Sequence, residues 1–254
     1  MNRKLKIVLR ISVLFLVLII GAKVYMDYRA IEIYKDINLD MFKNSNAPKP
    51  KGNYRILDCK NINQNDGYPT GCESVSAVIL LKYYGIDIEV SEFIYNYLDI
   101  SQLSEDKGRI VGPSPKEYYI GDPTSTSGYG CYAPVIINAF KKMLPSDMSY
   151  SDTSGQSLER LCNDYINNDI PVLVWATIDM KPPGEGRKWI IQSTGESFTW
   201  PAGEHCLVLV GYDDTHYYFN DPYNNNGLVA YSKETAASIY QAMGSQSVVI
   251  YPTG

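Results

Sequence analysis

Residues 67–85 read Gly-Tyr-Pro-Thr-Gly-Cys-Glu-Ser-Val-Ser-Ala-Val-Ile-Leu-Leu-Lys-Tyr-Tyr-Gly. Thr70 stands three residues before Glu73, which is the capping-box pattern and predicts Thr70 as the N-cap of a helix. Apolar residues recur through the following turns, and Gly85 is a typical terminating residue. The stretch therefore predicts a helix from Thr70 to Tyr84.

Cys72 lies in the first turn of this predicted helix. Unpaired backbone N–H groups and the positive end of the helix dipole favour a thiolate there, and they would also stabilise an oxyanion. A cysteine at a helix start can equally be a small buried residue with no chemical role. Cys72 is therefore a candidate nucleophile whose partners must be sought elsewhere in the chain.

The chain contains two histidines, His205 and His216. An apolar run follows His205 and an aromatic run begins at His216, so the two runs predict the strands of a β-hairpin. With the turn centred between Asp213 and Asp214, the register places Asp221 beside His205 at the open end of the hairpin. His216 is expected beside the turn, in contact with solvent.

A carboxylate beside an imidazole can hold one ring nitrogen while the other faces a nucleophile. Asp221 precedes Pro222, and Asp-Pro also commonly begins a turn. The hairpin register favours the functional interpretation. Cys72, His205 and Asp221 then supply the nucleophile, base and orienting carboxylate of a cysteine hydrolase.

Four motifs, in this order, resemble the stand-alone members of cysteine-peptidase family 39, which are related to double-glycine leader peptidases and more distantly to papain. They are the stretch around Cys72, Gly-Cys-Tyr-Ala-Pro at 130–134, Gly-Glu-His with its strand and Gly-Tyr-Asp-Asp, and Asn-Asp-Pro at Asp221. The resemblance covers about Tyr54 to Tyr251. It implies a papain-like fold with Cys72 as nucleophile, His205 as base and Asp221 as orienting residue.

The resemblance also implies that a glutamine upstream of the cysteine helps to form the oxyanion hole, and Gln64 is the candidate. Asparagines at 61, 63 and 65 surround it in a polar loop. A solvated loop residue is therefore the alternative to a donor aimed at an oxyanion.

The N-terminus predicts a membrane anchor. Met1–Arg10 carries four basic residues and no acid, and Ile11–Ala22 is apolar apart from Ser12. Ile7–Met26 has about the length of a membrane span, and the positive residues place the N-terminus in the cytoplasm and the remainder outside. A cleaved signal peptide, which would release a secreted protein, is the alternative.

We therefore predict three regions: residues 1–27 as N-terminus and transmembrane anchor, 28–53 as juxtamembrane stretch and linker, and 54–254 as the catalytic domain. Residues 43–53 are rich in Asn, Pro and Lys and are typical of a tether without packed structure. About 200 residues remain, enough for one domain with a sizeable core.

The net charge of −5 argues against nucleic acid as a partner, so the expected partners are a peptide or protein substrate and the membrane. No cofactor and no metal site are expected, because no cysteine pair has CxxC spacing and one of the two histidines is assigned to catalysis. Outside the cytoplasm, four cysteines could form two disulfides: Cys59, Cys131, Cys162 and Cys206. Cys206 is expected in the core, pointing away from the catalytic side.

Periodicity predicts helices first and strands later, an α+β arrangement in which the helix of the nucleophile packs against an antiparallel sheet. Further helices are expected at 91–98, 133–144, 156–166 and 232–243, and strands at 171–178, 188–192, 206–212, 217–220, 228–231 and 247–251. The Gly/Pro-rich passage 101–130 would border a cleft or cover a sheet edge. Trp200 would shield the catalytic pair or pack on the surface.

The sequence favours a membrane-anchored extracytoplasmic thiol peptidase. The same three residues would equally serve an acyltransferase or amidase acting on cell-wall peptide. A binding module that no longer uses its site is a third alternative, although such modules often lose the nucleophile.

Overall fold

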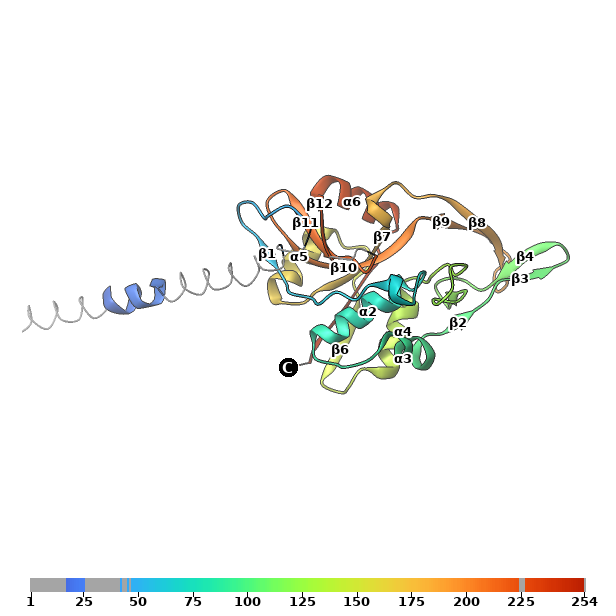
Figure 1. Ribbon diagram of the computed structural model, residues 1–254, viewed down its shortest axis with the longest axis horizontal. Coiled ribbons are helices and arrows are strands. Elements are labelled where there is room, and N and C mark those ends of the chain that lie inside the picture. The colour runs from blue at the N-terminus through green and yellow to red at the C-terminus, as the bar shows by residue number, and fades with distance from the viewer. Residues whose placement is uncertain (1–16, 26–41, 43–44, 46, 224–226, 254) are drawn as a thin grey trace, which may run out of the picture. The chain divides into compact units, whose positions relative to one another are not determined.

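The computed structural model describes residues 17–25, 42, 45, 47–223 and 227–253 (Figure 1). The chain divides into two compact units, Met1–Lys43 and Asn44–Gly254. In the first unit, residues 17–25 form a helix whose apolar side chains are exposed. Among the described residues, no helix has the length and apolar character that a membrane crossing needs. The rest of the predicted anchor lies outside the described residues.

The second unit has the predicted α+β architecture. Its helices are α2 (Cys72–Tyr83), α3 (Val90–Tyr97), α4 (Ala133–Met143), α5 (Leu158–Asp164) and α6 (Lys233–Ala242), with 3-10 turns η1 (Gln64–Asp66), η2 (Ile166–Asn168) and η3 (Ile178–Met180). Its strands are β1 (Arg55–Ile56), β2 (Ile100–Ser101), β3 (Ser104–Asp106), β4 (Arg109–Gly112), β5 (Tyr119–Ile120), β6 (Met148–Asp152), β7 (Val172–Thr177), β8 (Gly184–Ile191), β9 (Ser197–Ala202), β10 (Glu204–Tyr212), β11 (His216–Asn220), β12 (Leu228–Ser232) and β13 (Ser247–Pro252).

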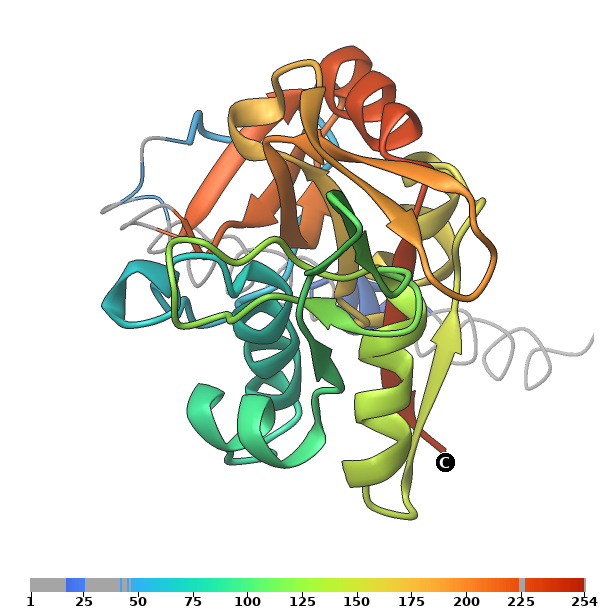
Figure 2. The ribbon, with the colours of Figure 1, turned by 90° about the vertical axis from the view of Figure 1, so that its right-hand side faces the viewer.

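A seven-stranded antiparallel sheet forms the centre of this unit. Its strand order is β12-β11-β10-β7-β13-β6, and β1 pairs with the far end of β10. Figures 1 and 2 show α2, α3 and α4 on one side of this sheet and α6 on the other. Every helix predicted from the sequence, and each predicted strand of this sheet, is present within a few residues of its expected bounds.

Helix α2 is buried on all sides from Cys72 to Leu81 and therefore forms the centre of the core. The predicted cap is wrong: Gly71 is the N-cap, and it makes no side-chain capping hydrogen bond. The Thr70 hydroxyl instead contacts two loop carbonyls, Asp122 O at 3.1 Å and Ser125 O at 2.8 Å. Tertiary hydrogen bonds have thus replaced the local capping box.

The passage 101–130 builds structure that the sequence did not predict. Strands β3 and β4 join β8 and β9 in a separate four-stranded sheet, and β2 pairs with β5. Trp189 and Trp200 are buried together on this second sheet, and Tyr132 stacks on Trp200 at a centroid distance of 5.7 Å. Trp200 is therefore a core residue, and the surface packing favoured for it is wrong.

Part of the predicted linker belongs to the second unit and is hydrogen-bonded to its hairpin. The Lys51 N–H donates to Asp213 Oδ2 at 2.8 Å, and the Tyr218 hydroxyl donates to the Pro48 carbonyl at 3.2 Å. All five cysteines are free and buried, so neither of the disulfides considered above is formed.

Candidate active site

The hairpin β10–β11 positions two of the predicted catalytic residues. Next to the turn Gly211 faces Tyr218, and past a bulge Val208 faces Asn220. Next to the turn the pairing is displaced by two residues from that expected, and the bulge reduces the displacement to one, so His205 still lies beside Asp221. The Asp213 carboxylate accepts the Thr215 and His216 N–H groups and so holds the turn closed.

His205 and Asp221 form a buried pair. His205 Nε2 lies 2.7 Å from Asp221 Oδ1, and the same oxygen accepts the Tyr223 N–H at 2.8 Å. Burial alone would raise the pKa of Asp221, but the charge and hydrogen bond of His205 outweigh it and lower this pKa below 3.8. Asp221 is therefore an ionised carboxylate that fixes the ring and leaves Nδ1 as the nitrogen open to a nucleophile.

His216 is separated from this pair. Its Nδ1 lies 2.8 Å from the Thr215 hydroxyl and 3.7 Å from Asp213 Oδ1, at the opposite end of the hairpin. His216 is partly exposed, as predicted for a turn residue.

Cys72 occupies the first position of α2 and is buried against β10. Its thiol donates a hydrogen bond to Glu73 Oε2 at 3.3 Å, and a Glu204 carboxylate oxygen lies within 4.8 Å of its sulfur. Glu204 directly precedes His205 in β10, so the candidate nucleophile lies next to the strand position of the candidate base. Within the part of the chain that the structure describes, no hydrogen bond joins the Cys72 sulfur to the imidazole.

The pKa of the Cys72 thiol is well above its usual value. Burial is the main cause, and the carboxyl groups of Glu73 and Glu204 add to it. The N–H groups of the first turn of α2 favour a thiolate, but they do not offset these effects. The sulfur therefore rests as a neutral thiol.

Gln64 is buried, so the solvated-loop alternative is wrong for this residue. Its backbone N–H donates to the Pro222 carbonyl at 2.8 Å, and its side-chain Nε2 donates to the Pro69 carbonyl at 3.1 Å. These bonds fix Gln64 between the residue that follows Asp221 and the turn that leads into Cys72. Its amide still has one N–H to offer, since an amide nitrogen carries two.

Two buried acids next to the catalytic candidates had no functional assignment from the sequence. Glu73 is fully buried, and its Oε1 accepts the Cys131 N–H at 2.5 Å. Glu204 is nearly as buried, and its Oε1 has no hydrogen-bond partner among the described residues. Their positions directly after Cys72 and directly before His205 are the signal that could have identified them.

Cys206 is buried, as predicted, but it does not lie away from the catalytic side. It shares the face of β10 that carries Glu204, and the carboxyl groups of Glu73 and Glu204 raise the pKa of its thiol, after burial itself. Strand alternation turns Cys206 away from His205 as expected, but its thiol lies close enough to Cys72 to raise the pKa of Cys72.

A sequence model of the Peptidase_C39 like family matches residues 56–248, which is most of the chain. This chain belongs to the Peptidase_C39 like family. The uncharacterized protein YvpB of Bacillus subtilis (strain 168) is 27% identical over 221 residues, covering 86% of this chain and 84% of YvpB. A crystal structure from Bacillus anthracis, described as a C39-like peptidase, matches with a TM-score of 0.69 and 26% identity. The match covers 80% of this chain and 100% of that one.

Family and fold together identify a stand-alone C39-like chain with the papain-like cysteine-peptidase fold. The match spans all four predicted site residues and the sheet that carries His205 and Asp221.

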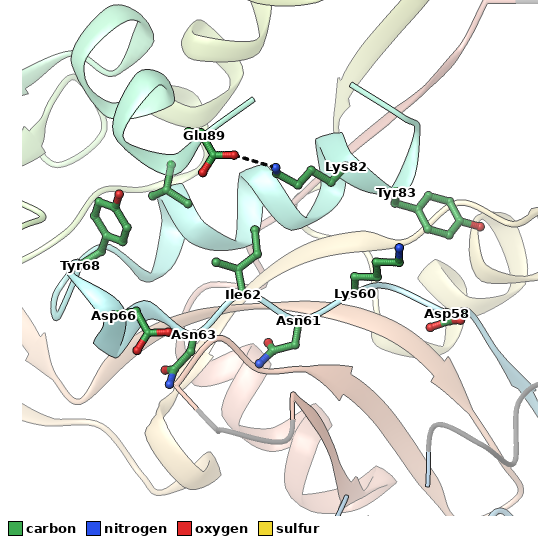
Figure 3. A pocket seen from close by; sticks show the side chains of 11 residues that line it. Asp58, Lys60, Asn61, Ile62, Asn63, Asp66, Tyr68, Lys82, Tyr83 and Glu89 are labelled. Carbon is green, nitrogen blue, oxygen red and sulfur yellow. Dashed lines mark hydrogen bonds and ion pairs between the residues drawn. The ribbon is translucent and has the colours of Figure 1, made fainter. Parts of the chain in front are cut away.

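A cavity of about 630 Å³ lies between residues 58–68 and helix α2 of this C39-like chain (Figure 3). Asn61, Ile62 and Asn63 line one wall, and Lys82 faces Glu89 across an ion pair of 3.1 Å on the other. None of the four predicted site residues lines it. The cavity therefore lies beside the C-terminal part of α2 and does not include the catalytic candidates.

Proposed function

We propose that this chain is a cysteine peptidase in which Cys72 attacks a peptide carbonyl, His205 is the base and Asp221 orients the base. The observation that carries the proposal is the buried His205–Asp221 pair at 2.7 Å, with Cys72 packed against the same strand. A papain-like family and fold give this geometry its chemical context.

The reaction follows from the positions of these groups. The Cys72 thiol turns from Glu73, its proton passes to His205 Nδ1, and the thiolate attacks the carbonyl carbon. Asp221 stabilises the imidazolium that forms. His205 then protonates the leaving amine as the carbon–nitrogen bond breaks, and a water molecule hydrolyses the remaining thioester.

The oxyanion of the tetrahedral intermediate needs donors beside the sulfur. The backbone N–H of Cys72 is one of the first-turn donors of α2 that have no partner within the helix. The second N–H of the Gln64 amide is the other donor we assign, since the Pro69 carbonyl holds this side chain and the Pro222 carbonyl holds its backbone close to the start of α2.

We further propose that the N-terminal segment tethers the domain to the outer side of the cell membrane. Four basic residues precede the apolar segment Ile11–Ala22, and the described part of that segment is helical with exposed apolar side chains. The test is fractionation of cells that express the full chain. Recovery in the membrane pellet after alkaline washing supports the tether, and recovery of a shortened chain in the medium supports signal-peptide cleavage instead.

The peptidase activity is tested with the purified full chain, a peptide library and cell-wall fragments. We expect peptide cleavage that Cys72→Ala abolishes and Cys162→Ala preserves, because Cys162 is an equally buried thiol on α5, away from the site. Turnover of cell-wall fragments alone would replace the peptidase by an amidase or acyltransferase. Cleavage that survives in Cys72→Ala would refute the assignment of the nucleophile.

A further inference from the structure

Five buried side chains, one of which is the proposed nucleophile, form a cluster that we call the acid–thiol cluster: Cys72, Glu73, Cys131, Glu204 and Cys206. The Cys72 sulfur and one carboxylate oxygen from each glutamate lie within 4.8 Å of one another. The peptidase reaction uses only one of these side chains. The two glutamates therefore need an explanation of their own.

The two carboxyl groups differ in their hydrogen bonds. Glu73 accepts two donors, the Cys72 thiol at 3.3 Å and the Cys131 N–H at 2.5 Å. The Oε1 of Glu204 has no hydrogen-bond donor among the described residues. A buried carboxylate without a donor is strongly disfavoured, and two carboxylates at this spacing cannot both ionise. Above about pH 7 the pair therefore holds one negative charge, on Glu73, and one proton, on Glu204.

Titratable groups face this pair from every element packed against it. Cys72 lies on α2, Tyr119 on β5, Tyr132 before α4, and His205 and Cys206 on β10. Burial raises the pKa of Glu73 to about 7, while the hydrogen bond from the Cys131 N–H and the charge of His205 favour the ionised form. Burial and the charge of Glu73 raise the pKa of Glu204 further above its usual value.

We propose that Glu73 is a positioning residue that holds Cys72 as a protonated thiol, turned towards Glu73 and away from His205, with protonated Glu204 beside the pair. This inference rests on the proposed function in one respect, the identity of the nucleophile. The resting site then differs from the stored thiolate–imidazolium pair of papain-type enzymes. Ionisation requires the sulfur to leave Glu73 and pass its proton to His205, which forms thiolate and imidazolium together.

The proposal makes an unusual prediction, because removing an acid next to the nucleophile should increase its reactivity. Glu73→Gln keeps an acceptor for the Cys131 N–H and removes the charge that opposes the thiolate. Glu204→Gln replaces a neutral group by another neutral group and should leave Cys72 unchanged at neutral pH. Glu92→Gln, on the exposed face of α3, is the matched control.

The experiment measures the rate at which iodoacetamide alkylates Cys72 in the full chain between pH 5 and 10, by mass spectrometry of the Cys72 peptide. For wild type we expect a midpoint above about 8.5, the ordinary thiol value. Glu73→Gln should lower this midpoint by about one pH unit or more, which is a ~10-fold faster reaction at pH 7. Glu204→Gln and Glu92→Gln should follow wild type at pH 7.

Several results would overturn the proposal. A wild-type midpoint below pH 7 would show a stored ion pair, and this result needs no variant to fold. A Glu73→Gln profile equal to wild type would show that Glu73 does not hold the thiol. Alkylation accelerated by Glu204→Gln as much as by Glu73→Gln would show that Glu204 is ionised. A stoichiometric divalent metal in the purified chain, whose removal by EDTA accelerates alkylation, would show that a cation and not a proton balances the two carboxylates.

Alkylation reads the thiol without any substrate. A chain that shows no peptide turnover, but whose Cys72 profile responds to Glu73→Gln, would refute the proposed function and leave this inference standing. Concurrent alkylation of buried Cys131 identifies a variant that has unfolded. If a variant unfolds, the pH midpoint of Cys72 alkylation in wild type tests the proposal instead.

Discussion

Gly130→Ala is the substitution whose effect the structure determines most directly. A methyl group at this position would lie 2.3 Å from Glu73 Oε1, 3.1 Å from Glu204 Oε2 and 3.1 Å from the Trp200 ring. Gly130 also has a φ of +153°, which side chains rarely adopt. The closest contact is with the oxygen that accepts the Cys131 N–H, so the carboxylate must move and that buried bond is lost.

The expected magnitude has two parts. The backbone strain of a non-glycine residue at positive φ costs about 1–2 kcal/mol, and a buried donor left without its acceptor costs about 1–3 kcal/mol. Gly67→Ala is the matched control, because Gly67 has a φ of +135° and no atom within 4 Å of the added methyl group. We therefore expect Gly130→Ala to lower the free energy of unfolding by about 3 kcal/mol and Gly67→Ala by about 1 kcal/mol.

Urea unfolding followed by tryptophan fluorescence measures both variants. Trp200 packs against Gly130 and the Trp175 indole donates to the Cys131 carbonyl, so tryptophan emission should report disruption of the cluster. A difference between the two variants of less than about 0.5 kcal/mol, the usual size of a neutral surface substitution, would refute the packing of Gly130 against the two glutamates.

Three further predictions follow from the same site. Asp221→Asn should lower the free energy of unfolding at pH 7 by about 1–3 kcal/mol. Because the native pKa of Asp221 is depressed, wild type loses this advantage as pH falls below 3.8. Urea unfolding should therefore show a difference between the two proteins at pH 7 that becomes smaller at pH 3. Buried Glu73 keeps its proton to about pH 7, whereas an unfolded glutamate releases it near 4.5, so Glu73 by itself should lower the free energy of unfolding by about 3 kcal/mol as pH rises through this range, and protonated Glu204 adds to this fall. Glu204→Gln should make the fall in the free energy of unfolding over pH 5–8 smaller. Equal pH dependence of this free energy in wild type and Glu204→Gln would contradict the buried acid pair. Thr70→Val should lower the free energy of unfolding by about 1–2 kcal/mol and speed proteolysis at 122–128, since the hydroxyl bonds to this loop are lost. Thr70→Ser keeps the hydroxyl and should match wild type in stability and proteolysis. Equal proteolysis of the two variants would count against those bonds.

Local spacing predicted the parts of the fold that local interactions determine. Gly85 ends α2 with a φ of +77°, as a terminating glycine should. The hairpin followed from the short turn at Asp213, and it brought His205 to Asp221 although the pairing next to the turn is displaced by two residues, which a bulge reduces to one. A single-residue shift changes which side chain lies directly opposite, yet neighbours across a ladder remain in reach.

The remainder depended on tertiary structure. Strand β6 has the sequence Met-Ser-Tyr-Ser-Asp and lies at a sheet edge, so it carries little of the apolar pattern that identifies a strand. Strand β9 contains Pro201, which argues against a strand in any local reading. Glu73 fits a capping box, and only the packing of Gly130 and β10 around it shows that its carboxylate is directed into the core.

The central claim is that Cys72 is a nucleophile activated by His205. The most direct measurement is covalent labelling of the full chain by a peptidyl epoxide, with mass spectrometry to locate the adduct among the five cysteines. We predict an adduct on Cys72 alone, and its rate of formation should fall by at least ~100-fold in His205→Ala, the range for loss of a general base. Labelling that is distributed over several cysteines, or that proceeds equally fast in His205→Ala, would contradict the account.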